Sequence, residues 1–94
     1  MKKLIVVARF KIQVGNEKEA LSELTKLLEA TRKEEGCIQY DLHVLQNSQQ
    51  EFMFYEVWTG LDALEKHRNT QHILNFRACR DKFFSGSPKC DFVG

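Results

Sequence analysis

The chain has 94 residues, of which 43% are apolar and 29% charged, and its formal net charge at pH 7 is +1. This length and composition predict a single globular domain over residues 1–94 and exclude a disordered chain. Lysines and arginines are scattered among the acidic residues, whereas nucleic-acid binding usually needs a basic stripe. No nucleic-acid partner is therefore expected.

The first residues do not have the pattern of a targeting or membrane segment. The apolar run LIVVA is interrupted by Arg9 and Lys11, so it is too short for a signal peptide or a membrane span. The cysteines Cys37, Cys79 and Cys90 are odd in number and far apart, which does not indicate a disulfide framework. We expect a cytoplasmic protein with reduced thiols and no membrane partner.

The first half of the chain predicts a strand, a helix and a second strand. Residues 4–12 alternate as in a strand, and Asn16 is expected to cap a helix over roughly residues 17–34. The apolar stripe of this helix consists of Ala20, Leu21, Leu24, Leu27 and Leu28. Gly36 is expected to end the helix as a C-terminal glycine, and residues 37–45 alternate again.

The second half begins with a polar connection, QNSQQ, and a return strand in EFMFYEVW. Helical spacing then returns in two pieces, LDALEKH and TQHILNFRACRDKFF, the second capped by Thr70, before a short final strand in KCDFV. The order is β-α-β-β-α-β with a broken second helical segment. This predicts an α+β, ferredoxin-like fold, with an antiparallel four-stranded sheet and helices on one face.

The strand EFMFYEVW is apolar on both faces. Phe52, Phe54, Glu56 and Trp58 lie on one face and Met53, Tyr55 and Val57 on the other. The helices can cover only one face, and exposing the other would cost several kcal/mol at about 25 cal/mol per Å². We expect a second copy to cover it, in a homodimer that pairs sheet face against sheet face. If Phe54 lies on that face, Phe54→Arg weakens the dimer.

Three segments, EEGCIQYDLHV, FYEVWTGLDALEKH and NTQHILNF, together resemble the antibiotic biosynthesis monooxygenase (ABM) domain family. The shared features are Gly36, an aromatic residue early in the next strand, the E-x-W of Glu56 and Trp58, and two histidines five residues apart, His67 and His72. The resemblance extends over about residues 3–93 and implies a dimeric α+β barrel built from two ferredoxin-like chains.

The resemblance also implies a range of activities. Known members include cofactor-free quinol and anthrone monooxygenases, haem-degrading enzymes, and an isomerase of a phosphorylated autoinducer-2 breakdown product. The haem-degrading branch uses an Asn, a Trp and an axial His, where this chain has Val7 or Ala8, His67 and Arg77. Haem degradation is not expected, and no cofactor is predicted.

The resemblance therefore implies a monooxygenase-like oxidoreductase that acts on a small aromatic, quinol-like or anthrone-like substrate without a cofactor. Two alternatives stay open: an isomerase of a small carbonyl compound, phosphorylated or not, and a non-enzymatic dimeric module that binds a ligand.

The predicted catalytic residues are His67, His72 and Glu56. A neutral histidine is the natural base near pH 7 for deprotonating a hydroxyarene, although the two histidines could instead tie down the helix junction. A metal site would need further ligands, for which only His43 and scattered acids are available, so no metal is predicted. Glu56 is expected to pair with a base on a neighbouring strand, or to pair with or orient one of the two histidines.

The predicted substrate-binding residues are mostly aromatic. Flat side chains can wall a pocket for a flat substrate, although they serve equally well as core. Asn69 is added because its amide could hold a carbonyl or hydroxyl group of the substrate. The set is Tyr40, Phe54, Trp58, Asn69 and Phe76.

Overall fold

The computed structural model describes residues 3–45, 50–86 and 89–93. Its elements are β1 (Leu4–Lys11), α1 (Glu17–Arg32), β2 (Cys37–Val44), β3 (Glu51–Trp58), α2 (Leu61–Arg68), α3 (Gln71–Phe83) and β4 (Lys89–Val93). The predicted order is confirmed, including the division of the second helical segment. Most of the predicted polar connection between β2 and β3 falls on residues 46–49, outside the described residues.

The four strands form one antiparallel sheet in the order β2-β3-β1-β4. In its middle, Ala8 of β1 lies opposite Phe54 of β3 on one side and Cys90 of β4 on the other. A bulge between Cys37 and Gln39 interrupts the pairing of β2 with β3. This topology confirms the α+β, ferredoxin-like prediction.

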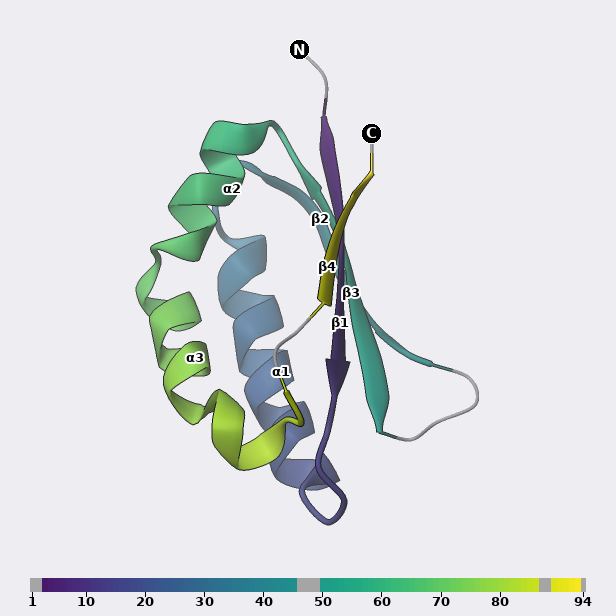
Figure 1. The fold of residues 1–94 in the computed structure, drawn as a ribbon. Coiled ribbons are helices and arrows are strands. Elements are labelled where there is room, and N and C mark those ends of the chain that lie inside the picture. The colour runs from purple at the N-terminus through teal and green to yellow at the C-terminus, as the bar shows by residue number, and fades with distance from the viewer. Residues whose placement is uncertain (1–2, 46–49, 87–88, 94) are drawn as a thin grey trace.

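All three helices cover the same face of the sheet, and the other face is open (Figure 1). The core between the layers is rich in aromatic side chains, among them Phe10, Phe54 and Phe76. Helix α1 buries Ala20, Leu24, Leu27 and Thr31, whereas Leu21, predicted on its apolar stripe, is 43% exposed. Among the described helices, none is both long and apolar enough to cross a membrane.

The two faces of β3 are now distinguished. Phe52, Phe54, Glu56 and Trp58 point toward the helices, and all four are buried. The ring of Phe54 packs against Phe10 and Tyr40, with centroid distances of 5.7 and 4.5 Å. Phe54 therefore does not lie on the open face, and Phe54→Arg would place a charge in the core instead of testing a dimer.

The open face consists of the alternate residues. By register, Ile5 and Val7 of β1 lie beside Val57 and Tyr55 of β3. Met53 completes this apolar centre, and Gln39, Asp41, His43 and Asp91 border it. The open face thus has an apolar middle and a polar rim.

The helix ends differ in part from the predictions. Thr70 caps α3 as expected, because its side chain accepts a hydrogen bond from the amide of Ile73. Asn16 makes no side-chain cap and instead donates to the carbonyl of Lys82 at 3.1 Å. Gly36 does not have a positive φ, so it is not a left-handed helix cap. A Cβ built at Gly36 would lie 2.3 Å from the Cβ of Ala63, so this glycine instead permits close approach of α2.

Candidate active site

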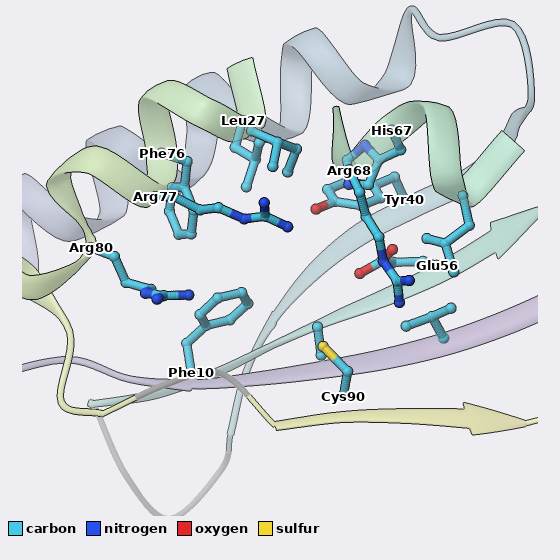
Figure 2. A pocket seen from close by; sticks show the side chains of 14 residues that line it. Phe10, Leu27, Tyr40, Glu56, His67, Arg68, Phe76, Arg77, Arg80 and Cys90 are labelled. Atoms are coloured by element: carbon cyan, nitrogen blue, oxygen red, sulfur yellow. The ribbon is translucent and has the colours of Figure 1, made fainter. Parts of the chain in front are cut away.

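A cavity of about 140 Å³ lies between the sheet and the helices (Figure 2). Its apolar walls are formed by Val6, Ala8, Phe10, Leu27, Leu64, Ile73 and Phe76. Its polar groups come from Tyr40, Glu56, His67, Arg68, Arg77, Arg80 and Cys90. Every strand and every helix contributes at least one residue, and the polar groups converge on one apolar space. This combination is typical of a small-molecule site.

One carboxylate connects the two predicted histidines. Oε2 of Glu34, in the turn after α1, lies 2.7 Å from Nδ1 of His67 and 2.7 Å from Nε2 of His72. Because a carboxylate oxygen only accepts, each ring presents a protonated nitrogen to it. The side chains of Glu34 and His67 are only 14% and 6% exposed, so water screens this pair weakly.

The surroundings of His67 fix its ring. The indole of Trp58 lies against it, with ring centroids 4.6 Å apart, and Tyr40 lies 5.8 Å away. Burial lowers the pKa of His67, while the hydrogen bond and charge of Glu34 oppose that change. His67 is therefore a neutral imidazole near pH 7, held through Nδ1. No hydrogen bond to its Nε2 occurs among the described residues.

Local sequence brings the Glu34 turn and the two histidines together. The hydroxyl of Thr70 donates to the carbonyl of His67 at 2.7 Å and also caps α3, which fixes the angle between α2 and α3. On the other side, the missing side chain of Gly36 lets the turn after α1 approach Ala63 of α2. These two contacts place Glu34 between histidines that belong to different helices.

Glu56 is a second buried ionisable group in the cavity. Its Oε1 accepts a hydrogen bond from Nε1 of Trp58 at 2.9 Å. Burial raises the pKa of Glu56 to about 7, although the Trp58 hydrogen bond and the charge of Arg68 act in the opposite direction. The expected pairing of Glu56 with a base on a neighbouring strand or with a histidine does not occur among the described residues, and Glu34 instead of Glu56 contacts the histidines.

Comparison with known proteins assigns the family. The model of the family "Antibiotic biosynthesis monooxygenase" matches residues 3–78. The chain belongs to the antibiotic biosynthesis monooxygenase family. Its similarity to "Putative monooxygenase YcnE" of Bacillus subtilis is 32% identity over 75 residues, which cover 80% of this chain and 79% of YcnE. Family and relative are thus both named for monooxygenase activity, in agreement with the predicted oxidoreductase class.

Solved structures of similar proteins have the same fold. The crystal structure of PA3566 from Pseudomonas aeruginosa matches with a TM-score of 0.93 and 31% identity, over 99% of this chain and 93% of PA3566. The structure of Rv0793 from Mycobacterium tuberculosis matches with a TM-score of 0.92 and 26% identity, over 99% and 94%. By contrast, the matches to YjcS of Bacillus subtilis and sll1783 of Synechocystis cover 54% and 50% of those proteins, so the chain spans about half their length.

In this ABM family member, the cavity gathers only part of the predicted site. Tyr40, Glu56, His67 and Phe76 line it. The other four predicted residues, His72, Phe54, Trp58 and Asn69, do not. Phe54 and Trp58 are fully buried behind the wall, His72 contacts Glu34, and the exposed Asn69 donates to the carbonyl of Glu65 at 2.9 Å. The cavity is thus in direct contact with only half of the predicted residues.

Sequence reasoning missed Glu34 and, among the three arginines of the cavity, Arg80. One signal for Glu34 was available: it and Glu35 follow the C-terminal end of α1, where the helix dipole disfavours negative charge. An acidic pair at that position indicates a compensating cation or hydrogen-bond donor elsewhere in the fold. Arg80 carries no such signal, because α3 is amphipathic whether or not a cavity lies beneath it.

The same cluster is a potential metal site. The ligand atoms of Glu34, His67 and His72 all lie within 4.8 Å of one another. Two imidazoles and a carboxylate form a donor set that divalent transition metals accept, with further positions left for water. The absence of a bound metal in this ABM protein stays a prediction.

Proposed function

We propose that this chain is a cofactor-independent monooxygenase that oxidises a small hydroxyarene in the cavity between sheet and helices. The observation that carries the proposal is the pair of Glu34 and His67: a buried carboxylate holds the Nδ1 side of a cavity-lining imidazole at 2.7 Å. Such a pair leaves the other ring nitrogen, Nε2, to accept a proton, as in the general scheme of an oriented base.

The volume of the cavity matches a single aromatic ring. An apolar cavity of about 150 Å³ accommodates one benzene molecule, and the cavity here has about 140 Å³. A one-ring quinol or phenol therefore fills this space, whereas the further rings of an anthrone would extend out of it. The aromatic rings of Phe10, Phe76 and Tyr40 supply flat walls against which such a ring can pack.

The reaction begins with removal of the hydroxyl proton of the substrate by Nε2 of His67. The arenolate passes one electron to O₂, and the resulting aryloxyl radical and superoxide combine at a ring carbon that carries hydrogen. The imidazolium of His67 returns its proton to the terminal peroxide oxygen. Loss of that C–H proton and of the O–O bond then releases water and leaves a carbonyl. Hydroxyarene plus O₂ gives quinone plus water, and the substrate supplies all four electrons.

A second candidate function is an isomerase of a small carbonyl compound. It is favoured by one observation: Glu56, whose pKa burial raises to about 7, lines the same cavity as the imidazole of His67. Two such groups can remove a proton at one carbon and return it at another without O₂. In this case turnover needs no oxygen, which separates the two functions by experiment.

We also propose that the protein is a homodimer through the open face of the sheet. That face has an apolar centre of Ile5, Val7, Met53 and Tyr55 with a polar rim, as described above. Val57, on the same face, is already buried in the single chain, where only 8% of its surface is exposed. Two copies related by a twofold axis would cover both open faces with one self-complementary interface.

Oxygen uptake tests the proposed function. Purified protein treated with a chelator is mixed with one-ring quinols, and each quinol is also run without protein because quinols autoxidise. We expect protein-dependent uptake that survives chelation and falls about 100-fold or more in His67→Gln. His43→Gln is the matched control, since His43 is exposed on β2, away from the cavity. Turnover without oxygen uptake would identify the isomerase, and uptake by His67→Gln at the wild-type rate would refute the base role.

A further inference from the structure

Three guanidinium groups surround the cavity. Arg68 comes from α2, and Arg77 and Arg80 come from α3, where a spacing of three places them on the same side of the helix. Figure 2 shows the side chain of Arg77 extending over the middle of the cavity and that of Arg80 reaching toward Phe10. Three cations above one apolar cavity repel one another unless an anion lies among them.

The acidic groups near these arginines leave two of them without a partner. Arg68 pairs with Glu65 at 3.0 Å, and its guanidinium carbon lies 5.7 Å from the ring centre of Phe92. Glu56 is the carboxyl group inside the cavity, and it is held by Trp58. Within the described part of the chain, no ion pair involves Arg77 or Arg80. The exposed Asp81 follows Arg80 directly in the chain, but the two form no ion pair among the described residues.

We infer that Arg77 and Arg80 form a subsite for an oxyanion group, carboxylate or phosphate, on the substrate. This inference rests on the proposed function, because it assigns a substrate class to the same cavity. The aromatic ring enters the apolar space beside His67, and the anionic substituent stays at the level of the two guanidinium groups. A substrate of this class is a one-ring hydroxyarene that carries an acidic substituent.

The geometry of the guanidinium group supports an oxyanion. Its N–H donors form a planar fork that binds two oxygens of a carboxylate or phosphate at once, and such charge-assisted hydrogen bonds are about twice as strong as neutral ones. Arg77 is exposed and Arg80 half-buried, so water screens part of this attraction, and the apolar walls beneath strengthen it only where the bound group displaces water. A neutral quinol would leave both cations unpaired above it.

The test is a binding titration that needs no turnover. The full-length protein is titrated, with NMR chemical shifts as readout, with para-hydroxybenzoate, phenyl phosphate and the neutral para-hydroxybenzamide. We expect the better of the two anions to bind at least about tenfold more tightly than the amide, since one charge-assisted hydrogen bond contributes about this factor. Whether the carboxylate or the phosphate binds more tightly identifies the oxyanion. In the double variant Arg77→Gln/Arg80→Gln the preference for the anion is lost, while the amide still binds.

Lys82→Gln is the control for net charge, because Lys82 is an exposed cation of the same helix that does not line the cavity. Equal binding of amide and anions, absence of anion binding, or an anion preference that survives in the double variant would each overturn the inference. Anion binding through the arginines with no oxygen uptake from any hydroxyarene would leave the subsite standing and refute the oxygenase. Oxygen uptake with quinols and no anion preference would support the oxygenase and refute the subsite.

Discussion

Glu34 and His67 are separated by 33 positions in the chain, yet their side chains form a hydrogen bond of 2.7 Å. The same carboxylate oxygen also accepts a hydrogen bond from His72, so one buried acid connects the turn after α1 with both α2 and α3. The imidazole of His67, the proposed base, is thus oriented by a group that does not line the cavity. This arrangement yields the first prediction.

Replacing Glu34 by Gln should reduce kcat about tenfold or more, because the amide cannot stabilise the imidazolium that forms during the reaction. It should also move the acidic limb of the pH profile to lower pH. The reason is that Glu34 raises the pKa of His67 against the effect of burial, so its removal lowers that pKa further. The rate measured across the pH range checks both effects.

Glu35→Gln is the control for this variant, since Glu35 is the exposed neighbour and makes no ion pair among the described residues. A role of Glu34 in folding alone would change the amount of folded protein and leave the position of the acidic limb unchanged. That outcome would contradict the positioning role.

The buried Glu56 predicts a pH-dependent stability. Its pKa is about 7 in the folded chain against 4.5 for a free glutamate, so the folded state favours the protonated form. The associated stability is fully present below pH 4.5 and is lost as the pH rises through about 7. At about 1.4 kcal/mol per pKa unit, the loss is on the order of 3 kcal/mol.

Thermal unfolding of Glu56→Gln between pH 4.5 and 8 checks this expectation. The Tm of the wild type should decline as the pH rises over this range, whereas the Tm of the variant should stay constant. Glu29→Gln, a change at an exposed position of α1, should follow the wild type. A decline of equal size in Glu56→Gln would show that another group is responsible.

Gly36 provides a steric prediction. An added Cβ at this position would lie 2.3 Å from the Cβ of Ala63, so Gly36→Ala must push the turn after α1 away from α2. Overpacking of this kind typically costs about 1–3 kcal/mol, and the shift would also separate Glu34 from His67. We expect a lower free energy of unfolding in urea together with a loss of activity.

Gly60→Ala is the matched control, because a Cβ at Gly60 meets nothing within 4 Å and its φ of 171° is ordinary extended backbone. If both alanine variants unfold at the same urea concentration as the wild type, the close approach at Gly36 has no energetic consequence.

The open face of the sheet predicts where a charge should break the assembly. Val7→Asp places a carboxylate in the middle of the apolar centre, where the partner sheet would desolvate it. We expect the sedimentation coefficient to fall to that of a single chain while the circular dichroism spectrum is retained. Val44→Asp should leave the assembly intact, because Val44 is 60% exposed and lies off the open face. A Val7→Asp protein that sediments like the wild type would rule out this interface.

The sequence predicts the elements well where periodicity decides, and poorly where contacts between distant residues decide. The order of strands and helices, the division after His67 and the Thr70 cap follow from local patterns. The faces of β3 do not, because both are apolar and the alternation fits either orientation. The sequence therefore leaves open whether Phe54 lies at a partner interface, and the structure places it in the core.

Two site residues illustrate the same limit. Glu56 was expected to pair with a cation or a histidine, but its partner is Trp58, two positions away on its own strand face. His67 and His72 were identified as a pair, but the acid between them comes from a turn that no periodicity connects to α2 or α3. Gly36 was interpreted as a helix stop, whereas what matters is the space that it leaves for Ala63.

Ala8 has a consequence for how this protein could change its substrate. It lies in the centre of the sheet between Phe54 and Cys90, and its small side chain forms part of the cavity wall. A larger residue there would fill part of the cavity from one of the two central strands of the sheet. Arg77 and Arg80, in contrast, lie on a helix surface. If the proposed substrate class holds, ring size and substituent charge depend on different layers of the fold, so selection could alter one preference without disturbing the other.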